Sequence, residues 1–349
     1  MKNYFLFAVA LVFLMTSCSK ENQLDVESSV QNPVQDENTL RGEETIIPKV
    51  TDGRLHFETE NEFGDYVRQL MDADVEETSS MQADLGFTSY YTMINTPFND
   101  NDPLVDPATI NSDPTVIIDD HLLLTVLDPN LEMQVGDRIY RVEENFAFSY
   151  AVGHYDQVEE FKSNSNEYEL PDEELHVIND HLSVAKHSTV ELDDRFWIFG
   201  YGWRTNAKHR SYGHHRNMKS VQWETNLFFY RSIGVKTKYE EKRGWWIFKV
   251  WQNVNTDYLE VKWDGQLKMK FSGSPILVYR SVSGIKKAYN KGVVSKVLFV
   301  EAGAGVTVGG GSNPNISGTI TSVDFEYLDS DHVCKRWGNT QYRNLNWIW

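Results

Sequence analysis

The sequence predicts an α+β N-terminal domain followed by an all-β, β-sandwich-like C-terminal domain. The charge changes sign along the 349-residue chain: residues 1–195 hold 11 Lys and Arg against 40 Asp and Glu, and residues 196–349 hold 22 against 11. All ten Trp residues lie in the second part. A joint change in charge and aromatic content is typical of a domain boundary. We therefore expect a signal peptide at 1–17, a lipidated disordered tether at 18–52, an acidic α+β domain at 53–194 and a basic, Trp-rich β-sandwich domain at 195–349.

The N-terminus has the organisation of a secretory signal peptide. Lys2 precedes a short apolar run at residues 5–14, and small residues follow it up to Cys18. The run is too short to span a bilayer, which needs about 20 residues. With a cysteine at the cleavage position, residues 15–18 resemble the lipobox of a bacterial lipoprotein. This resemblance implies a diacylglycerol thioether on Cys18, and so a membrane partner through the N-terminal lipid. An ordinary signal peptide with an unrelated cysteine is the alternative.

The segment that follows Cys18 is typical of a tether. Residues 19–52 contain no aromatic residue and are rich in Glu, Asp, Asn and Gln. Such a segment buries too little apolar surface to offset the entropy of ordering. If Cys18 carries a lipid, Cys334 has no cysteine partner within the mature chain, and we expect it to be buried and unreactive.

The acidic domain is predicted to contain helices and strands. Residues 54–57 form a short strand, and Thr59 and Glu62 form a capping box that starts a helix with one apolar stripe. A second, shorter piece, helical or of mixed structure, is expected at 86–94. Gly136 and Asp137 turn the chain between alternating strands at 131–135 and 139–142. The remaining predicted elements are a strand at 146–150 and helices at 158–161 and 175–185.

The basic domain reads as short strands at near-regular spacing, which favours a β-sandwich. Asp264-Gly265 is a strong hairpin signal, because a type I′ turn needs positive φ at both central residues. We expect an interruption of a strand at Gly234. The predicted strands cover residues 196–203, 221–239, 245–251, 258–263, 267–271, 293–300, 306–308, 319–327 and 345–349.

Taken together, the chain resembles the uncharacterised secreted lipoproteins of gut Bacteroidota. The resemblance lies in the lipobox, the acidic tether, residues 131–142 with their Val-Gly-Asp turn, and residues 232–246. It implies a layout and an outer-membrane location, on the periplasmic face or the cell surface. That group has no shared activity to carry over to this chain.

The sequence contains no legible catalytic or cofactor motif. A nucleophile elbow, a zinc-protease helix, a phosphate-binding loop and a dinucleotide fingerprint are all missing from it. His176 and His181 are five residues apart, which would place them on different faces of the predicted helix, so we expect no metal site there. We expect no cofactor, and the balance leans away from an enzyme.

Residues 204–219 form a basic segment without an acidic residue, and we expect a long loop there. Two interpretations are open. The segment could dock onto the protein's own acidic domain, which we favour because the opposite charge is tethered nearby, or it could recruit an anionic polymer such as an acidic polysaccharide. We do not expect nucleic acid as a partner.

The strand at 245–251 is the candidate binding element. Its aromatic side chains share a face with a lysine, which suggests that this face is partly wet, and flat exposed rings are suited to stacking on sugars. Core or domain-interface packing is the alternative. The predicted ligand-binding residues are Trp245, Trp251, Lys249, Tyr201, Trp203, Arg204 and Arg210.

We therefore expect a lipid-anchored envelope protein with a non-catalytic binding role, for which a glycan is the favoured ligand. A structural or assembly partner in the outer-membrane envelope is the rival hypothesis. A hydrolase comes third, because carboxylates from distant positions can converge without leaving a sequence motif.

Overall fold

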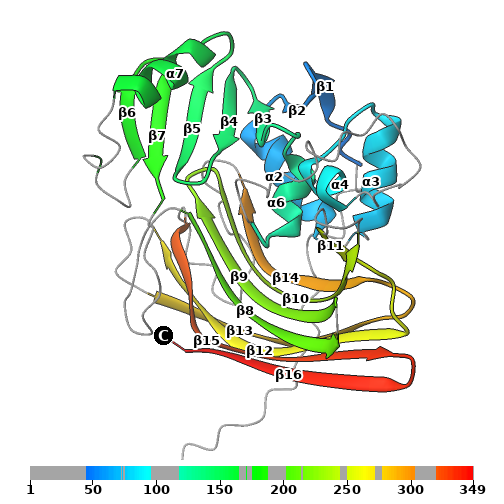
Figure 1. Cartoon of the computed structure of the whole chain (residues 1–349). Helices are drawn as coiled ribbons and strands as arrows, with labels where there is room; N and C mark the ends of the chain where they lie inside the picture. The colour runs from blue at the N-terminus through cyan, green and yellow to red at the C-terminus, as the bar shows by residue number, and fades with distance from the viewer. Residues whose placement is uncertain are drawn as a thin grey trace, which may run out of the picture. The chain divides into compact units, whose positions relative to one another are not determined.

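The computed structural model describes residues 45–95 other than 72 and 74, 118–164, 170, 175–187, 202–213, 215–243, 250–271, 277–302 and 320–348. Residues 45–349 form one compact unit (Figure 1). The fold of the described part is mostly β, with a few helices. Its strands form a seven-stranded, a five-stranded and a four-stranded sheet.

The seven-stranded sheet has the order β1-β2-β3-β4-β5-β7-β6. Neighbouring strands in it are antiparallel, except β2 and β3, which are parallel. Its strands are β1 (Lys49–Thr51), β2 (Arg54–Phe57), β3 (Glu132–Val135), β4 (Arg138–Val142), β5 (Phe146–Ala151), β6 (Leu175–Asn179) and β7 (Leu182–Lys186). The strands predicted at 54–57, 131–135, 139–142 and 146–150 are confirmed, whereas β1 lies within the segment that we expected to be tether.

The helices accompany this first part of the chain. They are α2 (Glu60–Leu70), α3 (Val75–Asp84), α4 (Tyr90–Asn95), α6 (His121–Val126) and α7 (Tyr155–Asn164). The predicted start of α2 is confirmed, since the Thr59 side chain accepts a hydrogen bond from the Glu62 backbone N–H. The Glu62 carboxylate in turn accepts from the Glu58 N–H at 2.6 Å, one residue before the expected position. The apolar stripe of α2 is buried, as predicted.

The helix predicted at 175–185 is wrong. These residues form the antiparallel hairpin of β6 and β7. Asn179 makes the turn, because its side-chain oxygen accepts hydrogen bonds from the N–H groups of His181 and Leu182 at 2.8 and 3.0 Å. An Asn that bonds to backbone groups two and three residues ahead competes with helical bonding.

The five-stranded and four-stranded sheets are formed by the second part of the chain. The first contains β8 (Gly202–Gly213), β9 (Arg216–Leu227), β10 (Tyr230–Arg243), β11 (Val250–Asn253) and β14 (Val293–Ala302). The second contains β12 (Tyr258–Phe271), β13 (Leu277–Ala288), β15 (Ile320–Arg336) and β16 (Asn339–Ile348). The orders are β11-β10-β9-β8, with β14 also paired to β10, and β13-β12-β15-β16.

Two sequence predictions fail in these sheets. The basic segment 204–219 is not a loop but the hairpin of β8 and β9. Asp264-Gly265 is not a turn, because β12 continues through it as a single strand. A Cβ on Gly265 would lie 2.9 Å from the Leu328 side chain, so the glycine provides room for packing rather than a turn.

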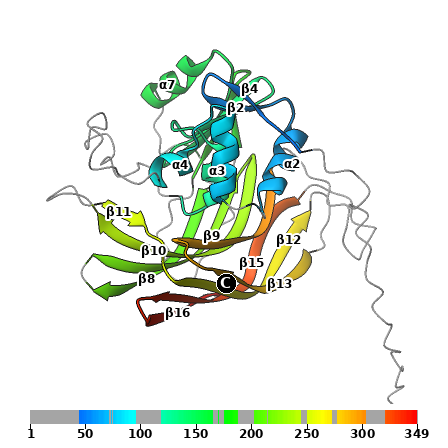
Figure 2. The same ribbon diagram turned by 90° about the vertical axis from the view of Figure 1, so that its right-hand side faces the viewer.

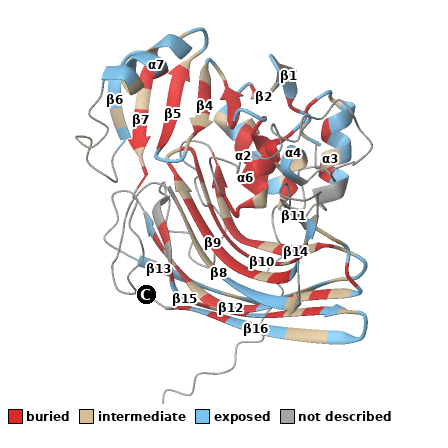
Figure 3. Ribbon diagram, in the orientation of Figure 1, coloured by how far each residue is buried: buried red, intermediate tan, exposed pale blue. Residues whose placement is uncertain are grey.

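One hydrophobic cluster draws on both parts of the chain. It joins the apolar stripe of α2, the leucines of α6 and buried residues of β9 and β10, which appear as buried in Figure 3. Helix α2 contacts β14, and the approach is close at Gly64, where a Cβ would lie 2.8 Å from the Ala302 carbonyl oxygen (Figure 2). The boundary expected near residue 194 lies outside the described residues, and separate folding of the two parts stays a prediction.

A second cluster fills the space between the five-stranded and four-stranded sheets. It includes Val235 and Tyr239 of β10, Val261 of β12 and Phe325 of β15. Cys334 belongs to it and is buried, as expected. Burial raises the pKa of its thiol, which disfavours the reactive thiolate.

Candidate functional site

The structure describes four of the seven predicted ligand-binding residues: Trp203, Arg204, Arg210 and Trp251. Trp245, Lys249 and Tyr201 lie outside the described residues, and so does Cys18. Trp203 is partly buried, packs against the cluster of α2 and α6, and makes an edge contact with His187 at 4.8 Å between ring centroids. Trp203 therefore has a packing role rather than that of an open platform.

Arg204 is also engaged inside the protein. Its guanidinium forms an ion pair with Glu224 on the neighbouring strand β9 and lies 5.9 Å from the ring centroid of Trp347. Both charged side chains are largely buried, at 16% and 6% exposed. An arginine held in this way has little freedom to contact a ligand, whereas Arg210, further along β8, is exposed.

Trp251 retains the properties expected of a binding residue. It lies on β11, is 46% exposed and is paired across the sheet with Lys242 of β10. The Lys242 ammonium is 5.9 Å from the Trp251 ring centroid. A wet ring beside a cation can accept a sugar face and an anionic substituent together.

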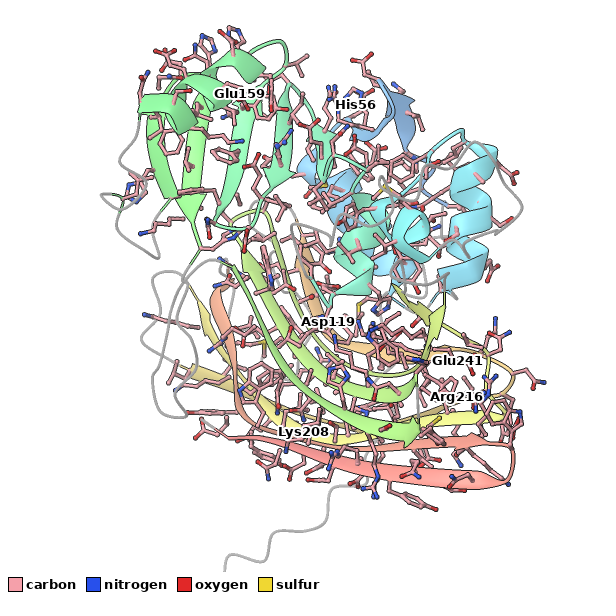
Figure 4. The ribbon with its side chains drawn as sticks, viewed as in Figure 1. His56, Asp119, Glu159, Lys208, Arg216 and Glu241 are labelled. Carbon is pink, nitrogen blue, oxygen red and sulfur yellow. The ribbon has the colours of Figure 1, made fainter. Side chains whose placement is uncertain are left out.

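A second exposed tryptophan, Trp337, was not predicted from the sequence. It follows the end of β15, where Arg336 pairs with Glu241 near the end of β10. Trp337 is 61% exposed and forms the turn between β15 and β16. The guanidinium carbons of Arg216 and Arg336 lie 4.2 and 4.3 Å from its ring centroid. Glu241 forms an ion pair with Arg216 at 3.5 Å, and both are labelled in Figure 4. Glu241 also forms an ion pair with Arg336 at 3.1 Å. These pairs join the end of β10 to the end of β15.

The backbone at Trp337 is strained. Trp337 has φ of 51° and is followed by Gly338 with φ of 75°, which are the signs of a type I′ turn. This turn favours Asn-Gly, and a bulky residue with positive φ is a true outlier. The Trp337 N–H donates a 2.8 Å hydrogen bond to Asp257. Strained backbone of this kind is common at binding and active sites. The Trp337-Gly338 pair, which has a bulky residue where the turn favours Asn, is the signal of it that can be read from the sequence.

We call this region the strand-end surface, because its members lie within a few residues of the β8–β9 turn, the β15–β16 turn or the end of β10. It consists of Arg210, Arg216, Lys242, Trp251, Lys335, Arg336 and Trp337. The cross-strand pairs Glu241↔Arg216 and Lys242↔Trp251 are adjacent along β10, so Trp251 and Arg216 lie on opposite faces of the five-stranded sheet at one end. Trp337, in the β15–β16 turn of the four-stranded sheet, lies on the Arg216 side.

The remaining charged cluster is internal. Asp119, which precedes α6, forms ion pairs with Lys219 of β9 at 3.0 Å and with Lys236 of β10 at 3.1 Å. Burial by itself would raise the pKa of Asp119, but Lys236, Lys219 and Lys238 outweigh it and hold that pKa far below the usual value. Burial lowers the pKa of Lys236 to about 8, against the opposing effect of Asp119.

Lys219 belongs to the basic segment, so one cation of that segment does contact the acidic part of the chain. Asp120 continues the attachment: its carboxylate caps α6 by accepting from the Leu122 and Leu123 N–H groups and accepts from the Ser232 hydroxyl. The His121 ring is 5.4 Å from the Trp223 ring and within 3.1 Å of Ser295 Oγ. Burial lowers the pKa of His121 to about 3, so it is neutral at physiological pH.

A cavity of about 510 Å³ opens beside the seven-stranded sheet. Three of its four charged lining residues are paired with one another, Arg141 with Glu143 at 2.7 Å and Lys162 with Glu143 at 3.1 Å, and the fourth is the exposed Glu144. Arg141 also pairs with the buried Glu132 at 2.9 Å. Because most of its charged lining residues are already held in ion pairs, the cavity is a weaker candidate for a binding site than the strand-end surface.

Across the described ranges, no three His, Cys, Asp or Glu side chains gather in a way that could hold a metal ion. His176 lies on β6 and His181 in the turn after it, where it stacks on His154 with 3.9 Å between ring centroids. None of the helices in the described part of the chain has the length and apolarity needed to cross a membrane.

Known proteins resemble this chain only weakly. No protein-family profile and no curated protein matches the chain. Among solved structures, the chain is similar to a DUF4848 family protein from Bacteroides thetaiotaomicron, with 11% sequence identity, 86% of this chain and 100% of that chain covered, and a TM-score of 0.19. The neighbour is thus a Bacteroidota protein of a family without a named function, and a likeness of this strength carries no argument about activity.

Proposed function

We propose that this protein is a lipid-anchored protein of the outer membrane whose β-sandwich-like domain binds a glycan without catalysis. The anchor rests on the lipobox-like residues before Cys18. The single observation that carries the binding role is the pair of exposed tryptophans, Trp251 and Trp337, beside cations at one end of the strands. Exposed rings at strand ends offer apolar platforms that are flanked by hydrogen-bond donors.

The test is a glycan array probed with the mature protein in detergent micelles. We expect binding to at least one class of polysaccharide and a loss of that signal in Trp251→Ala. Tyr279→Ala is the matched control, since Tyr279 is an aromatic residue with a similar exposure of 49% on β13. Trp245→Ala extends the test to the other tryptophan predicted on the same strand and face as Trp251. Absence of any array signal, or equal loss in Trp251→Ala and Tyr279→Ala, would refute the proposal.

An assembly role in the envelope is the second candidate, and one observation favours it. Strand β6 is at the edge of the seven-stranded sheet and exposes apolar side chains, with Val177 72% exposed and Leu175 41% exposed. An exposed edge of this kind can accept a strand from another protein. We expect that crosslinking in intact cells captures one defined envelope partner, and that Val177→Lys abolishes this capture while glycan binding persists.

A further inference from the structure

We propose that the strand-end surface recognises an anionic saccharide, one that carries uronate or sulfate groups, rather than a neutral glycan. The inference rests on the proposed glycan-binding function and names the class of ligand. It is carried by three observations: the local charge, the arrangement of the arginines around Trp337, and the strain at that residue.

The strand-end surface is cationic in a protein that is acidic overall. The formal net charge of the chain is −18. The cationic side chains of this surface are Arg210, Arg216, Lys242, Lys335 and Arg336. The described carboxylates near them include Glu241, Asp257 and Glu240, which is paired with Lys238 at 2.6 Å. A polyanion is repelled by the acidic residues 1–195 and attracted by the basic residues 196–349, and the cations of the strand-end surface are those that lie beside exposed tryptophan rings.

The two arginines beside Trp337 differ in exposure and in how firmly other residues hold them. Arg336 is 12% exposed and is fixed by Glu241 and by a hydrogen bond to the Asn255 carbonyl. Arg216 is 44% exposed, and its ion pair with Glu241 is long at 3.5 Å. Arg336 therefore supports the Trp337 ring, and Arg216 is the guanidinium that can turn a bidentate edge toward a carboxylate or sulfate.

The ring and the guanidinium together match an acidic sugar. The Trp337 ring can stack on the apolar face of a pyranose while Arg216, 4.2 Å from the ring centroid, pairs with an acidic group on the same residue. On the opposite face of the sheet, Lys242 and Trp251 repeat the combination of cation and ring. Two such positions at one end suit a chain with repeated acidic residues, because linked contacts strengthen each other.

The experiment measures the affinity of the full mature protein in detergent micelles for four probes. These are polygalacturonate, heparin, neutral dextran, and vesicles of phosphatidylcholine with phosphatidylglycerol. We expect binding to polygalacturonate or heparin, weakening steeply between 50 and 300 mM NaCl, since screening acts on exposed charges over roughly 8–10 Å. We expect dextran to bind at least about tenfold more weakly.

The decisive variants are Arg216→Gln and Trp337→Asn. Each should weaken binding to the acidic polysaccharide by about tenfold. Trp337→Asn places the residue that a type I′ turn prefers, so it removes the ring without harming the fold. Lys270→Gln, which removes an exposed charge at the other end of β12, is the matched control and should leave affinity unchanged.

The outcomes separate the two proposals. Equal affinity for dextran and the acidic polymers, or equal effects of Arg216→Gln and Lys270→Gln, overturns the anionic ligand while glycan binding stands. Binding to none of the polysaccharides, here and on the array, overturns both. Because the lipid on Cys18 inserts into vesicles by itself, vesicle binding counts only where Arg216→Gln weakens it. Such binding to anionic vesicles, without binding to any polysaccharide, overturns the saccharide in favour of a lipid surface.

Discussion

Replacing Asp119 with Asn should destabilise the folded protein by about 3–5 kcal/mol, the usual cost of removing one partner of a buried ion pair. Asp119 pairs with Lys219 and Lys236, whose side chains are 14% and 8% exposed. Asn keeps the shape of the side chain but leaves both ammonium groups without this counter-charge. Lys236 can relieve part of the cost by losing its proton, because its pKa is already lowered to about 8 by burial.

The assay is urea unfolding at pH 7, followed by tryptophan fluorescence, on chains that carry Cys18→Ala to prevent lipidation. Arg68→Gln is the control, because Arg68 and its partner Asp65 are 44% and 53% exposed and such a surface pair contributes about 0–1 kcal/mol. The double variant Asp119→Asn with Lys236→Met should recover part of the loss, since it removes the stranded charge. A loss below about 1 kcal/mol in Asp119→Asn would show that this cluster does not hold α6 to the sheet.

The remaining predictions concern the anchor, a glycine and the buried histidines. Cys18→Ala should move the protein from the detergent phase to the aqueous phase in Triton X-114 partitioning; unchanged partitioning would refute the lipid anchor. Gly234→Ala should lower the urea midpoint by an amount worth about 1–3 kcal/mol, because its Cβ would lie 2.2 Å from the Trp223 ring, and an unchanged midpoint contradicts this packing. Burial lowers the pKa of three histidines, to about 3 for His121 and His332 and to about 4 for His187. The unfolded chain therefore binds more protons at these histidines below pH 6.5, so stability should fall on acidification toward pH 4, with the three histidines together contributing at most about 4 kcal/mol per pH unit. His332→Gln should reduce that slope by about a third, and an unaltered slope would refute the assignment.

Local elements were predictable where side chain and backbone signals agree. The capping residue Thr59 and a 3.6-residue apolar period both point to α2, and the structure has both. Gly136 turns the chain with φ of 60° between β3 and β4, as the alternating residues on each side indicate. In these places the tertiary structure adds nothing that contradicts the local preference.

The sequence analysis was wrong about elements whose structure depends on contacts with residues far away in the sequence. Leu175 and Leu182 fit a helical spacing, but the backbone bonds of Asn179 make a turn between them. Gly265 looks like a turn residue until Leu328 is packed against it. The basic segment looks like a loop because its counter-charges are far away in sequence: Glu224 for Arg204, Glu241 for Arg216 and Asp119 for Lys219.

The candidate site could be predicted only in part, because it too depends on residues that are far apart in the sequence. Trp251 was predicted because its strand alternates, and its exposure of 46% fits that prediction. Trp337 stands alone in the sequence between Arg336 and Gly338, and its importance depends on Arg216 and Glu241, which arrive from other strands. A Trp-Gly pair at a tight hairpin is nevertheless a conflict between residue and turn that sequence reasoning can detect.

The attachment of α6 to the sheet has a consequence for how the chain matures. Asp119 and Asp120 bind Lys236 and Ser232, which are synthesised more than a hundred residues later. Until those strands emerge, the leucines of α6 can pack against α2 but lack their partners on β9 and β10, and the two carboxylates lack their donors on β10. Contacts of such long range are slow to form, so the packing of the first part of the chain should be completed only when β10 is available. Holdase chaperones should therefore bind this segment first and release it once β10 has been made.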